Sequence, residues 1–215
     1  MRAETTVVGT PRPRRTFKRL EQVIDAAAHV FAQLGFHGAS THDIAAHLGI
    51  RQSSLYYYFR TKDSALELVC GRGVEGYLEN GRMAAVSPGS QADRLRAIVR
   101  AHIEPMLERP DYVRVFLTQR RFLAPEARVR IKSIEQQYER IIQRVINDGI
   151  RSGEFRDDLP ARDVMLSLLG ACNAANLWQG AIPGMTVARA QRVVGSLIID
   201  GLIAGPTAGQ GVTRA

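Results

Sequence analysis

Apolar residues recur at intervals of three and four between Leu20 and Leu34, which is the spacing of one face of an α-helix. Gly35 follows and is expected to end this helix as its C-cap. Helical spacing returns in most later segments, whereas no run alternates apolar and polar residues as a half-buried strand would. The sequence also has no internal repeat of solenoid length. We therefore expect an all-α protein with about nine helices.

Residues 40–48 are expected to form a short second helix. Ser40 and Asp43 fit a capping box, in which the serine hydroxyl and the aspartate carboxylate satisfy free backbone donors at the helix start. Gly49 then permits a sharp turn, and Ile50 is an apolar residue that can plug it. The segment predicts a helix followed by a tight turn.

Residues 53–59 are expected to form a third helix, with Ser53 and Ser54 as N-cap candidates. Leu55 and Phe59 are four residues apart and should both face inward. Two short helices joined by a glycine-containing turn and packed on a longer first helix make a helix-turn-helix. Such a unit places its second short helix in the major groove of DNA.

Polar side chains near this third helix are suited to contact DNA. The amide of Gln52 both donates and accepts hydrogen bonds, as base edges require. The hydroxyls of Tyr57 and Tyr58 can reach phosphates, and Lys62 adds a positive charge at the start of the next helix. Tyr56 is expected to pack inward toward that helix. A packed aromatic cluster is the alternative interpretation of the three tyrosines.

Positive charge is concentrated at the N-terminal end. The chain carries 29 Lys and Arg against 21 Asp and Glu, a net charge of +8 that favours an anionic partner. Residues 1–62 hold +5 of this charge. Residues 1–18 lack hydrophobic periodicity and contain two prolines, which predicts a disordered basic arm that contacts DNA phosphates or the minor groove. A solubility tail is the alternative.

The rest of the chain is expected to contain six further helical segments. Thr61 can cap the first of them, and the clearest are the last two, which are rich in Leu, Ile, Val and Ala. The five segments after the Thr61-capped helix lie near 91–108, 111–121, 125–151, 161–180 and 187–204.

Several classes of function are disfavoured. No run approaches the roughly 18 consecutive apolar residues of a membrane span, and no apolar core follows the basic N-terminus as in a signal peptide, so we expect a cytoplasmic protein. Cys70 and Cys172 lie far apart and are expected to be small core residues. The histidines do not converge on a metal, and no nucleotide-loop or hydrolase motif occurs. We therefore expect no metal, cofactor or enzymatic activity.

The segments STHDIAAHLGI at 40–50, SSLYYYF at 53–59 and TKD at 61–63 closely resemble the DNA-binding domain of the tetracycline-repressor (TetR/AcrR) family of transcriptional regulators. The sequence departs from the family pattern at Arg51 and Tyr58, which bears on the operator sequence. The DNA-contacting candidates follow from this resemblance and, for those at or near the start of the third helix, also from that position. They are Thr41, His42, Arg51, Gln52, Ser53, Ser54, Tyr57, Tyr58 and Lys62.

The resemblance also implies the division of the chain. Residues 1–18 are the arm, 19–64 the helix-turn-helix domain, 65–205 a ligand-binding and dimerisation domain, and 206–215 a flexible tail. It implies a homodimer through the last two helices. The DNA geometry independently requires a dimer, because two recognition helices must meet successive major grooves about 34 Å apart. Both of these helices carry apolar faces that permit such packing.

A ligand cavity is expected in the larger domain, although most apolar candidates can equally be core residues. Asn173 and Asn176 are amides on an apolar helix, and they need a partner, a water, a ligand or the other subunit. The arginines at 120, 121, 128 and 130 can bind a ligand's phosphate or carboxylate, or form a solvated face. The candidate ligand-binding residues are Met106, Tyr112, Phe116, Phe122, Tyr138, Met165, Leu169, Cys172, Asn173, Asn176 and Trp178.

Together, these expectations predict a ligand-responsive regulator, which in this family is most often a repressor. We expect it to be released from a palindromic operator by a small apolar effector. Residues 120–128 and 149–155 loosely resemble members that respond to fatty-acyl or acyl-CoA compounds. A sensor of drugs or other hydrophobic compounds is the alternative within the family. The alternatives of a different class are an enzyme with a cavity in the helical domain and an architectural DNA binder that uses only the basic arm.

Overall fold

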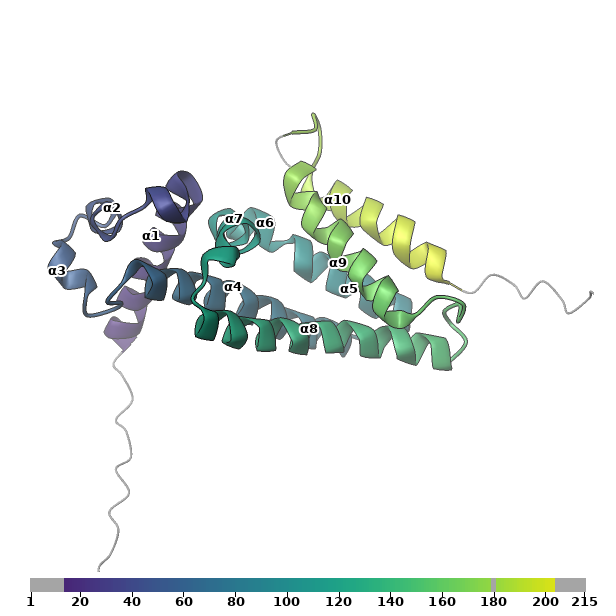
Figure 1. The fold of residues 1–215 in the computed structure, drawn as a ribbon. Coiled ribbons are helices and arrows are strands. Elements are labelled where there is room, and N and C mark those ends of the chain that lie inside the picture. Colours follow the sequence, from purple (N-terminus) through teal and green to yellow (C-terminus); the bar gives the residue numbers. More distant parts are fainter. Residues whose placement is uncertain (1–13, 179–180, 204–215) are drawn as a thin grey trace, which may run out of the picture.

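The computed structural model describes residues 14–178 and 181–203, and this part of the chain is almost entirely helical (Figure 1). Its one β-type pairing is an isolated bridge between Phe155 and Ile203. The all-α prediction is confirmed. None of the helices in these two ranges is both long and apolar enough to cross a membrane.

Three helices form the N-terminal end of the molecule. They are α1 (Arg14–Gly38), α2 (Thr41–His47) and α3 (Gln52–Leu55). The predicted disordered arm, residues 1–18, overlaps α1 by five residues, so its boundary is wrong, and residues 1–13 lie outside the described part. The helix starts earlier than expected because helical backbone does not depend on the apolar periodicity, which begins only at Leu20.

Local signals set the ends of these helices. Gly35 has a φ of 69° and breaks the helical path inside α1, as predicted for a C-cap. The capping box at the start of α2 is confirmed: the Ser40 hydroxyl accepts from the Asp43 amide, and the Asp43 carboxylate accepts from the Ser40 amide at 2.8 Å. Gly49 has a φ of 63° and forms the tight turn between α2 and α3.

The third helix is shorter than expected. It ends at Leu55, and residues 56–58 form a turn. Ser53 and Ser54 do not cap it; Arg51 occupies the N-cap position without a side-chain hydrogen bond. Leu55 and Phe59 are buried as predicted. One full turn is enough here because Leu55 anchors it in the core, and burial outweighs the cost of a short helix.

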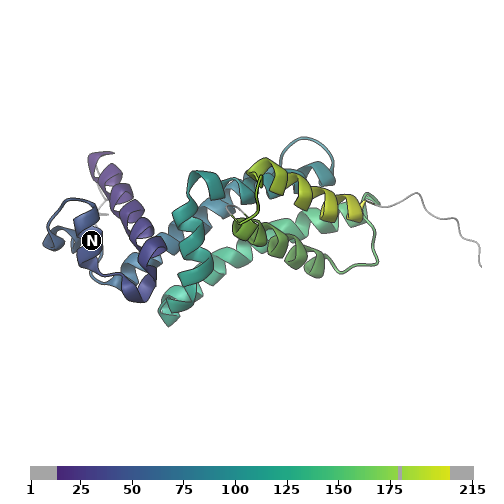
Figure 2. The same cartoon turned by 90° about the horizontal axis from the view of Figure 1, so that it is seen from above.

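The larger part of the molecule is built on two long helices, α4 and α8, that lie side by side and extend from the α1–α3 end (Figures 1 and 2). Thr61 caps α4 as predicted, and its hydroxyl accepts from the Ser64 amide. The helices after α3 are α4 (Lys62–Ala85), α5 (Gln91–Ile103), α6 (Pro105–Glu108), α7 (Pro110–Gln119), α8 (Pro125–Arg151), α9 (Ala161–Trp178) and α10 (Val187–Val194).

Two predicted segments differ in detail. The segment expected at 91–108 is divided into α5 and α6, because Pro105 starts a new helix. The last segment begins as α10 and continues as a π-helical stretch, Gly195–Asp200, which packs on α5. The ends predicted at 180 and 204, and the tail 206–215, lie outside the described residues.

The buried side chains form two clusters that share α4, α7 and α8. The N-terminal cluster joins α1–α3 to α4, α7 and the start of α8, and includes Phe31, Leu55, Leu66, Val115 and Phe116. The C-terminal cluster joins the rest of α4 and α8 to α5, α9 and α10, and includes Leu95, Ile103, Ile142, Met165 and Ile199. The helix-turn-helix is therefore packed directly on helices that continue into the other end of the molecule.

Candidate nucleic-acid interface and ligand pocket

The nine DNA-contacting candidates lie on α2, on the α2–α3 turn, on α3 and just after it, at one end of the molecule (Figure 1). His42, Arg51, Ser53, Ser54 and Tyr57 are exposed, while Thr41, Gln52, Tyr58 and Lys62 are half-buried. All nine therefore retain at least partial access to solvent, as a DNA contact requires.

A hydrogen bond joins the two short helices. The Nε2 atom of Gln52 on α3 donates to Oγ1 of Thr41 on α2 over 2.7 Å. This bond fixes the Gln52 side chain and leaves its carbonyl oxygen and second amide hydrogen available for a base edge. The Thr41 hydroxyl can still donate its own hydrogen to a phosphate.

The tyrosines differ from the expected arrangement. Tyr56 is 51% exposed and does not pack inward, so that prediction is wrong. Tyr58 takes the inner position: it is half-buried, packs on the N-terminal cluster and meets the ring of Tyr57 edge-on at 5.2 Å. The exchange follows from the end of α3 at Leu55, since the turn directs residues 56–58 differently from a helix. Tyr57, at 77% exposed, is the most accessible of the three.

Lys62 is held against the end of α1. Its Nζ donates to the carbonyl oxygen of Ala39 over 2.9 Å and lies 4.6 Å from the centre of the Phe36 ring. The sequence assigned this lysine to phosphate contact only. Its position shows a structural role as well, because it ties the start of α4 to the segment between α1 and α2.

Polar contacts connect α1 to α7, and sequence reasoning missed them. Tyr112 donates its hydroxyl hydrogen to Asp25 over 2.7 Å, and Nδ1 of His29 lies 2.9 Å from a carboxylate oxygen of Asp111. Burial and the nearby carboxylate of Asp25 raise the pKa of Tyr112. Tyr112, predicted to bind ligand, holds α1 through this hydrogen bond, and it also borders a separate pocket between α4 and α6–α7.

The backbone after the break at Gly35 is also anchored to α7. The amide of Phe36 donates to Gln119 Oε1 over 2.9 Å, and the Phe36 ring stacks on Phe122 at 5.7 Å. Phe122, another ligand candidate, is thus half-buried against the helix-turn-helix. These side chains are far apart in sequence, and no local signal predicts their pairing.

A pocket of about 390 Å³ lies among α4, α5, α7, α8 and α9; we call it the central pocket. Its volume is in the range of small-molecule sites. Four predicted ligand residues, Phe116, Tyr138, Leu169 and Asn173, line it. The full lining is Val74, Tyr77, His102, Phe116, Arg120, Lys132, Glu135, Tyr138, Glu139, Leu166, Leu169, Gly170 and Asn173.

The other predicted ligand residues lie elsewhere. Met106, Met165 and Cys172 are buried in the C-terminal cluster, so they follow the alternative interpretation as core residues. Trp178 is half-buried against the same cluster. The side chain of Asn176 lies outside the described residues. Apolar periodicity does not distinguish a pocket wall from a core, which is why the sequence did not separate these residues from the four that line the central pocket.

A buried polar cluster lies in the wall of the central pocket. His102 is 5% exposed, with Nε2 3.2 Å from Asn173 Oδ1 and Nδ1 3.0 Å from the Tyr138 hydroxyl. Burial lowers the pKa of His102 to about 4, so the ring is neutral at pH 7. Because the carbonyl oxygen of Asn173 only accepts, Nε2 carries the proton and Nδ1 accepts from Tyr138. The ring of Tyr77 stacks on His102 at 4.7 Å.

This cluster accounts for the polar partner predicted for Asn173 and for the glycine at position 81. Asn173 was expected to need a polar partner, and His102 supplies it. Gly81 on α4 faces the ring of Tyr138 so closely that any side chain at this position would collide with it. His102 itself was not predicted, since a lone histidine on an apolar helix face gives no signal of its partners on α8 and α9.

Charged side chains occupy one side of the central pocket. Arg120 pairs with Glu135 over 2.7 Å, and its guanidinium lies 4.9 Å from the centre of the Phe116 ring. Burial raises the pKa of Glu135. Of the other predicted anion-binding arginines, Arg130 pairs with Glu67, and Arg128 donates to backbone carbonyls, so neither faces this pocket.

Within the described residues, no group of three His, Cys, Asp or Glu side chains is placed to hold a metal ion. Cys70 and Cys172 are buried, as expected, and burial raises the pKa of each thiol to about 12. Neither thiol is therefore activated as a nucleophile.

Two family models match the chain. One, described as bacterial regulatory proteins of the tetR family, matches residues 23–69; the other, described as the tetracyclin repressor-like C-terminal domain, matches residues 88–201. Among curated relatives, the fatty acid metabolism regulator protein of Bacillus subtilis is 25% identical over 66% of this chain and 73% of its own length. The transcriptional repressor KstR2 of Rhodococcus jostii is 23% identical over 86% of this chain and 91% of its own.

Solved structures of similar fold cover most of the chain. AibR in complex with isovaleryl coenzyme A and operator DNA has a TM-score of 0.77 at 19% identity, covering 86% of this chain and all of its own. FadR of Bacillus subtilis in complex with stearoyl-CoA has a TM-score of 0.73 at 22% identity, covering 85% of this chain and 98% of its own. At these identities, the likeness shows a common fold.

Proposed function

Because the chain belongs to the tetracycline-repressor family of transcriptional regulators, we propose that it represses transcription from a palindromic operator and that an acyl-CoA or fatty-acyl effector in the central pocket releases it. DNA binding and response to a ligand are properties of the family. The operator symmetry, the effector class and the direction of the response are our proposals. The relatives named above are regulators and not enzymes.

The observation that carries the proposal is the position of α7 between the pocket and the helix-turn-helix. Phe116 of α7 lines the central pocket, while Asp111 and Tyr112 of the same helix hold α1. A ligand that enters between α4 and α7 therefore acts on the helix that supports α1. Such a ligand changes DNA affinity only if it binds one arrangement of these helices more tightly than another, and if the two arrangements differ in their affinity for DNA.

For the DNA interface we propose contacts from the nine candidates, with Gln52 reading base edges. The preformed bond between Gln52 and Thr41 supports this role, because a side chain that is already oriented loses less entropy on binding. Arg51 and Tyr57 are exposed beside it and can reach phosphates. We assign residues 19–64 to the DNA-binding domain and residues 65–205 to the ligand-binding and dimerisation domain.

For the effector we propose a largely apolar molecule with one carbonyl group. Val74, Phe116 and Leu169 give the pocket apolar walls, and the polar group in the wall is the cluster around His102. With His102 bonded to Oδ1 of Asn173, the NH₂ of that amide is left to donate to a ligand carbonyl. Two structural relatives hold acyl-CoA thioesters, which have this chemistry.

We propose that α9 and α10 form the dimer interface. They lie together at the end of the molecule opposite α3 (Figure 1). Leu166 on α9 is 49% exposed, and Leu197, in the π-helical stretch after α10, is 75% exposed. Large apolar side chains left on adjacent helices favour burial against a second copy.

The test begins with selection of bound sequences from random duplex DNA, which should yield a palindrome. Affinity for it is then measured with palmitoyl-CoA, free CoA and an unrelated hydrophobic drug. We expect palmitoyl-CoA to weaken binding by about tenfold or more, within the usual range of coupling energies, and free CoA to have no effect. Release by the drug alone would favour the hydrophobic-compound sensor, and recovery of no common sequence would refute a specific regulator.

A pair of variants locates the effector. Leu169→Phe narrows the central pocket and should abolish release by palmitoyl-CoA while operator affinity persists. Leu107→Phe, on the exposed surface of α6, is the matched control and should respond as the unmodified protein does. Equal responses from both variants would place the effector outside this pocket.

A further inference from the structure

The separate pocket between α4 and α6–α7 has a volume of about 460 Å³, which is within the range of small-molecule sites. We call it the α4–α7 pocket. Its inner wall is aromatic and apolar, because Tyr77, Tyr112 and Val113 are buried. Its charged residues, such as Glu75 and Glu108, are exposed and lie at its rim. The inner part of this pocket is therefore suited to apolar groups.

Tyr77 belongs to the walls of two pockets. Among the described residues, it is the only one that lines both the α4–α7 pocket and the central pocket. On α4, Val74 lines the central pocket and Gly73 lines the α4–α7 pocket. On α7, Phe116 lines the central pocket and Val113, about one turn earlier, lines the α4–α7 pocket. The boundary between the pockets therefore crosses the same two helices at Tyr77.

The side chain of Tyr77 starts directly at this boundary. A helical side chain leans over the residues three and four positions before it, which for Tyr77 are Val74 and Gly73. Tyr77 is only 8% exposed, so the surrounding helices enclose its ring. Gly73 leaves the space on its own side open, because a Cβ atom added there would meet no atom within 4 Å. The ring thus closes the central pocket at a point where empty space follows.

The buried polar cluster holds this ring in place. The rings of Tyr77 and His102 stack with 4.7 Å between their centres, and the ring of Tyr138 lies 6.3 Å from that of Tyr77. His102 is in turn bonded to Tyr138 and Asn173. Displacement of the Tyr77 ring would therefore expose a histidine that is fixed by two hydrogen bonds.

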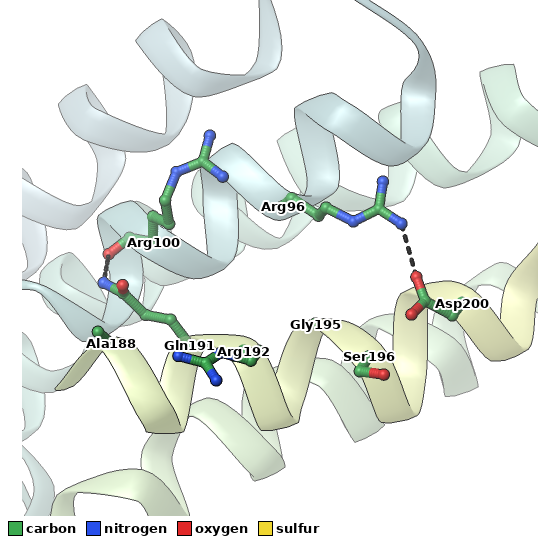
Figure 3. A pocket seen from close by; sticks show the side chains of 8 residues that line it. All are labelled: Arg96, Arg100, Ala188, Gln191, Arg192, Gly195, Ser196 and Asp200. Carbon is green, nitrogen blue, oxygen red and sulfur yellow. Dashed lines mark hydrogen bonds and ion pairs between the residues drawn. The ribbon is translucent and has the colours of Figure 1, made fainter. Parts of the chain in front are cut away.

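Helix α5, which carries His102, is itself braced from its other side. Arg96 pairs with Asp200 over 2.6 Å, and Nε2 of Gln191 donates to the carbonyl oxygen of Arg100 over 3.3 Å (Figure 3). His102 follows Arg100 by two residues, so it faces away from these bonds and toward Tyr77. The wall behind the Tyr77 ring is therefore anchored to the helix that contains α10.

We propose that Tyr77 limits the length of the apolar chain that an effector can place in the central pocket. This inference rests on the acyl effector proposed above. A chain that reaches the ring meets a fixed wall, and any further methylenes must stay in water and gain nothing from burial. Without the ring, the central pocket continues into the α4–α7 pocket, where Val113 and the open space at Gly73 accept a longer chain.

The test measures the Kd of acyl-CoAs from hexanoyl to eicosanoyl by calorimetry, with the full chain and without DNA. In the unmodified protein, we expect the Kd to fall with chain length up to a limit and then to stop falling. Tyr77→Ala should move this limit to longer chains, and each further buried methylene should lower the Kd by about fourfold.

Tyr77→Phe is the matched control. It keeps the ring, and among the described residues the Tyr77 hydroxyl has no hydrogen-bond partner to lose. The length limit should therefore stay where it is in the unmodified protein. Tyr77→Leu shortens the side chain with a smaller loss of packing than Tyr77→Ala, and it should move the limit in the same direction. This variant keeps the test decisive if Tyr77→Ala does not fold.

Gly73→Leu supplies a reversal, because it fills the α4–α7 pocket from α4 and replaces a helical glycine by a better helix former. Alone, it should leave the length limit unchanged. Combined with Tyr77→Ala, it should restore the limit of the unmodified protein. Restoration would show that the longer chains enter the α4–α7 pocket and not another opening.

The possible failures are distinguishable. The same limit in folded Tyr77→Ala and Tyr77→Phe variants would overturn the role of Tyr77, as would a longer limit that Gly73→Leu does not reverse. A Kd that keeps falling up to eicosanoyl-CoA in the unmodified protein would also refute it. If no acyl-CoA of any length binds, the effector class proposed above is refuted, and this inference falls with it.

Discussion

Tyr112 on α7 donates a hydrogen bond to Asp25 on α1, with 2.7 Å between the hydroxyl oxygen and the carboxylate oxygen. The next residue toward the N-terminus of α7, Asp111, contacts His29 one turn further along α1. Two adjacent residues of one helix thus hold two successive turns of another. Since Phe116 of α7 also lines the central pocket, this pair of contacts is a direct polar connection between a pocket helix and the helix-turn-helix.

Tyr112→Phe tests that connection. It removes the hydroxyl and keeps the ring, so we expect a loss of about 1 kcal/mol in the free energy of unfolding. The larger effect should be on coupling: palmitoyl-CoA should weaken operator binding less in this variant than in the unmodified protein. DNA affinity measured with and without palmitoyl-CoA gives the coupling directly. Tyr56→Phe removes an exposed hydroxyl, so it serves as the control and should preserve the response to palmitoyl-CoA. Equal coupling in both variants would contradict a role of the Tyr112–Asp25 bond in connecting the pocket to the helix-turn-helix.

Gln52→Ala tests the proposed reading of base edges. We expect operator affinity to fall by about 1–3 kcal/mol, the usual value of one good amide contact to a base. Affinity for random duplex DNA should change little, because phosphate contacts are kept. Gln136→Ala, on the exposed face of α8, is the control. An equal loss on specific and random DNA would assign Gln52 to the backbone and not to the bases.

Features that depend only on neighbouring residues, such as helix caps and tight turns, could be predicted from the sequence. The capping box of Ser40 and Asp43 and the turn at Gly49 need only residues that lie within a few positions, and both are confirmed. Tyr56 was placed inward because a seven-residue helix was assumed, and burial of Leu55 is sufficient to end the helix earlier. The inner tyrosine is therefore Tyr58.

Contacts between distant segments were beyond prediction from one sequence. Asn173 was recognised because an amide on an apolar helix needs a partner, but nothing local identifies that partner as His102. Predicted ligand residues such as Met165 and Phe116 have the same apolar character, and only the packing of α4, α7, α8 and α9 decides that Phe116 faces the pocket. Tertiary packing, not propensity, sets this part of the site.

His102 should make stability depend on pH. Burial lowers its pKa from the ordinary value of 6.5 to about 4 on folding, so between these values the unfolded chain binds a proton that the folded chain does not. Stability is then complete above pH 6.5 and is lost as the pH falls toward 4, by about 3 kcal/mol in total. Urea unfolding at pH 7 and pH 5 measures the loss, and His102→Gln should reduce it.

Direct titration provides a check that does not depend on that variant. In NMR spectra recorded between pH 8 and pH 5, the imidazole signals of His102 should stay constant, because the ring is buried and neutral throughout. A midpoint near 6.5 for His102 would show that its ring is accessible and that the hydrogen-bonded cluster in the pocket wall does not persist in solution.

Leu197→Glu tests the proposed dimer. Leu197 is 75% exposed on the helix that carries the proposed interface, and a carboxylate there should cost little in the isolated chain but must be desolvated in a dimer. We expect a folded protein that sediments as a monomer at micromolar concentration. It should also lose operator affinity, because one copy presents only one recognition helix. Leu107→Glu introduces the same charge at a position that is 60% exposed on α6, outside the proposed interface, and this variant should remain dimeric. If the Leu197→Glu variant stays dimeric while the Leu107→Glu variant dissociates, the interface lies away from α10. If the unmodified chain is a monomer at every concentration measured, the proposed dimer is refuted.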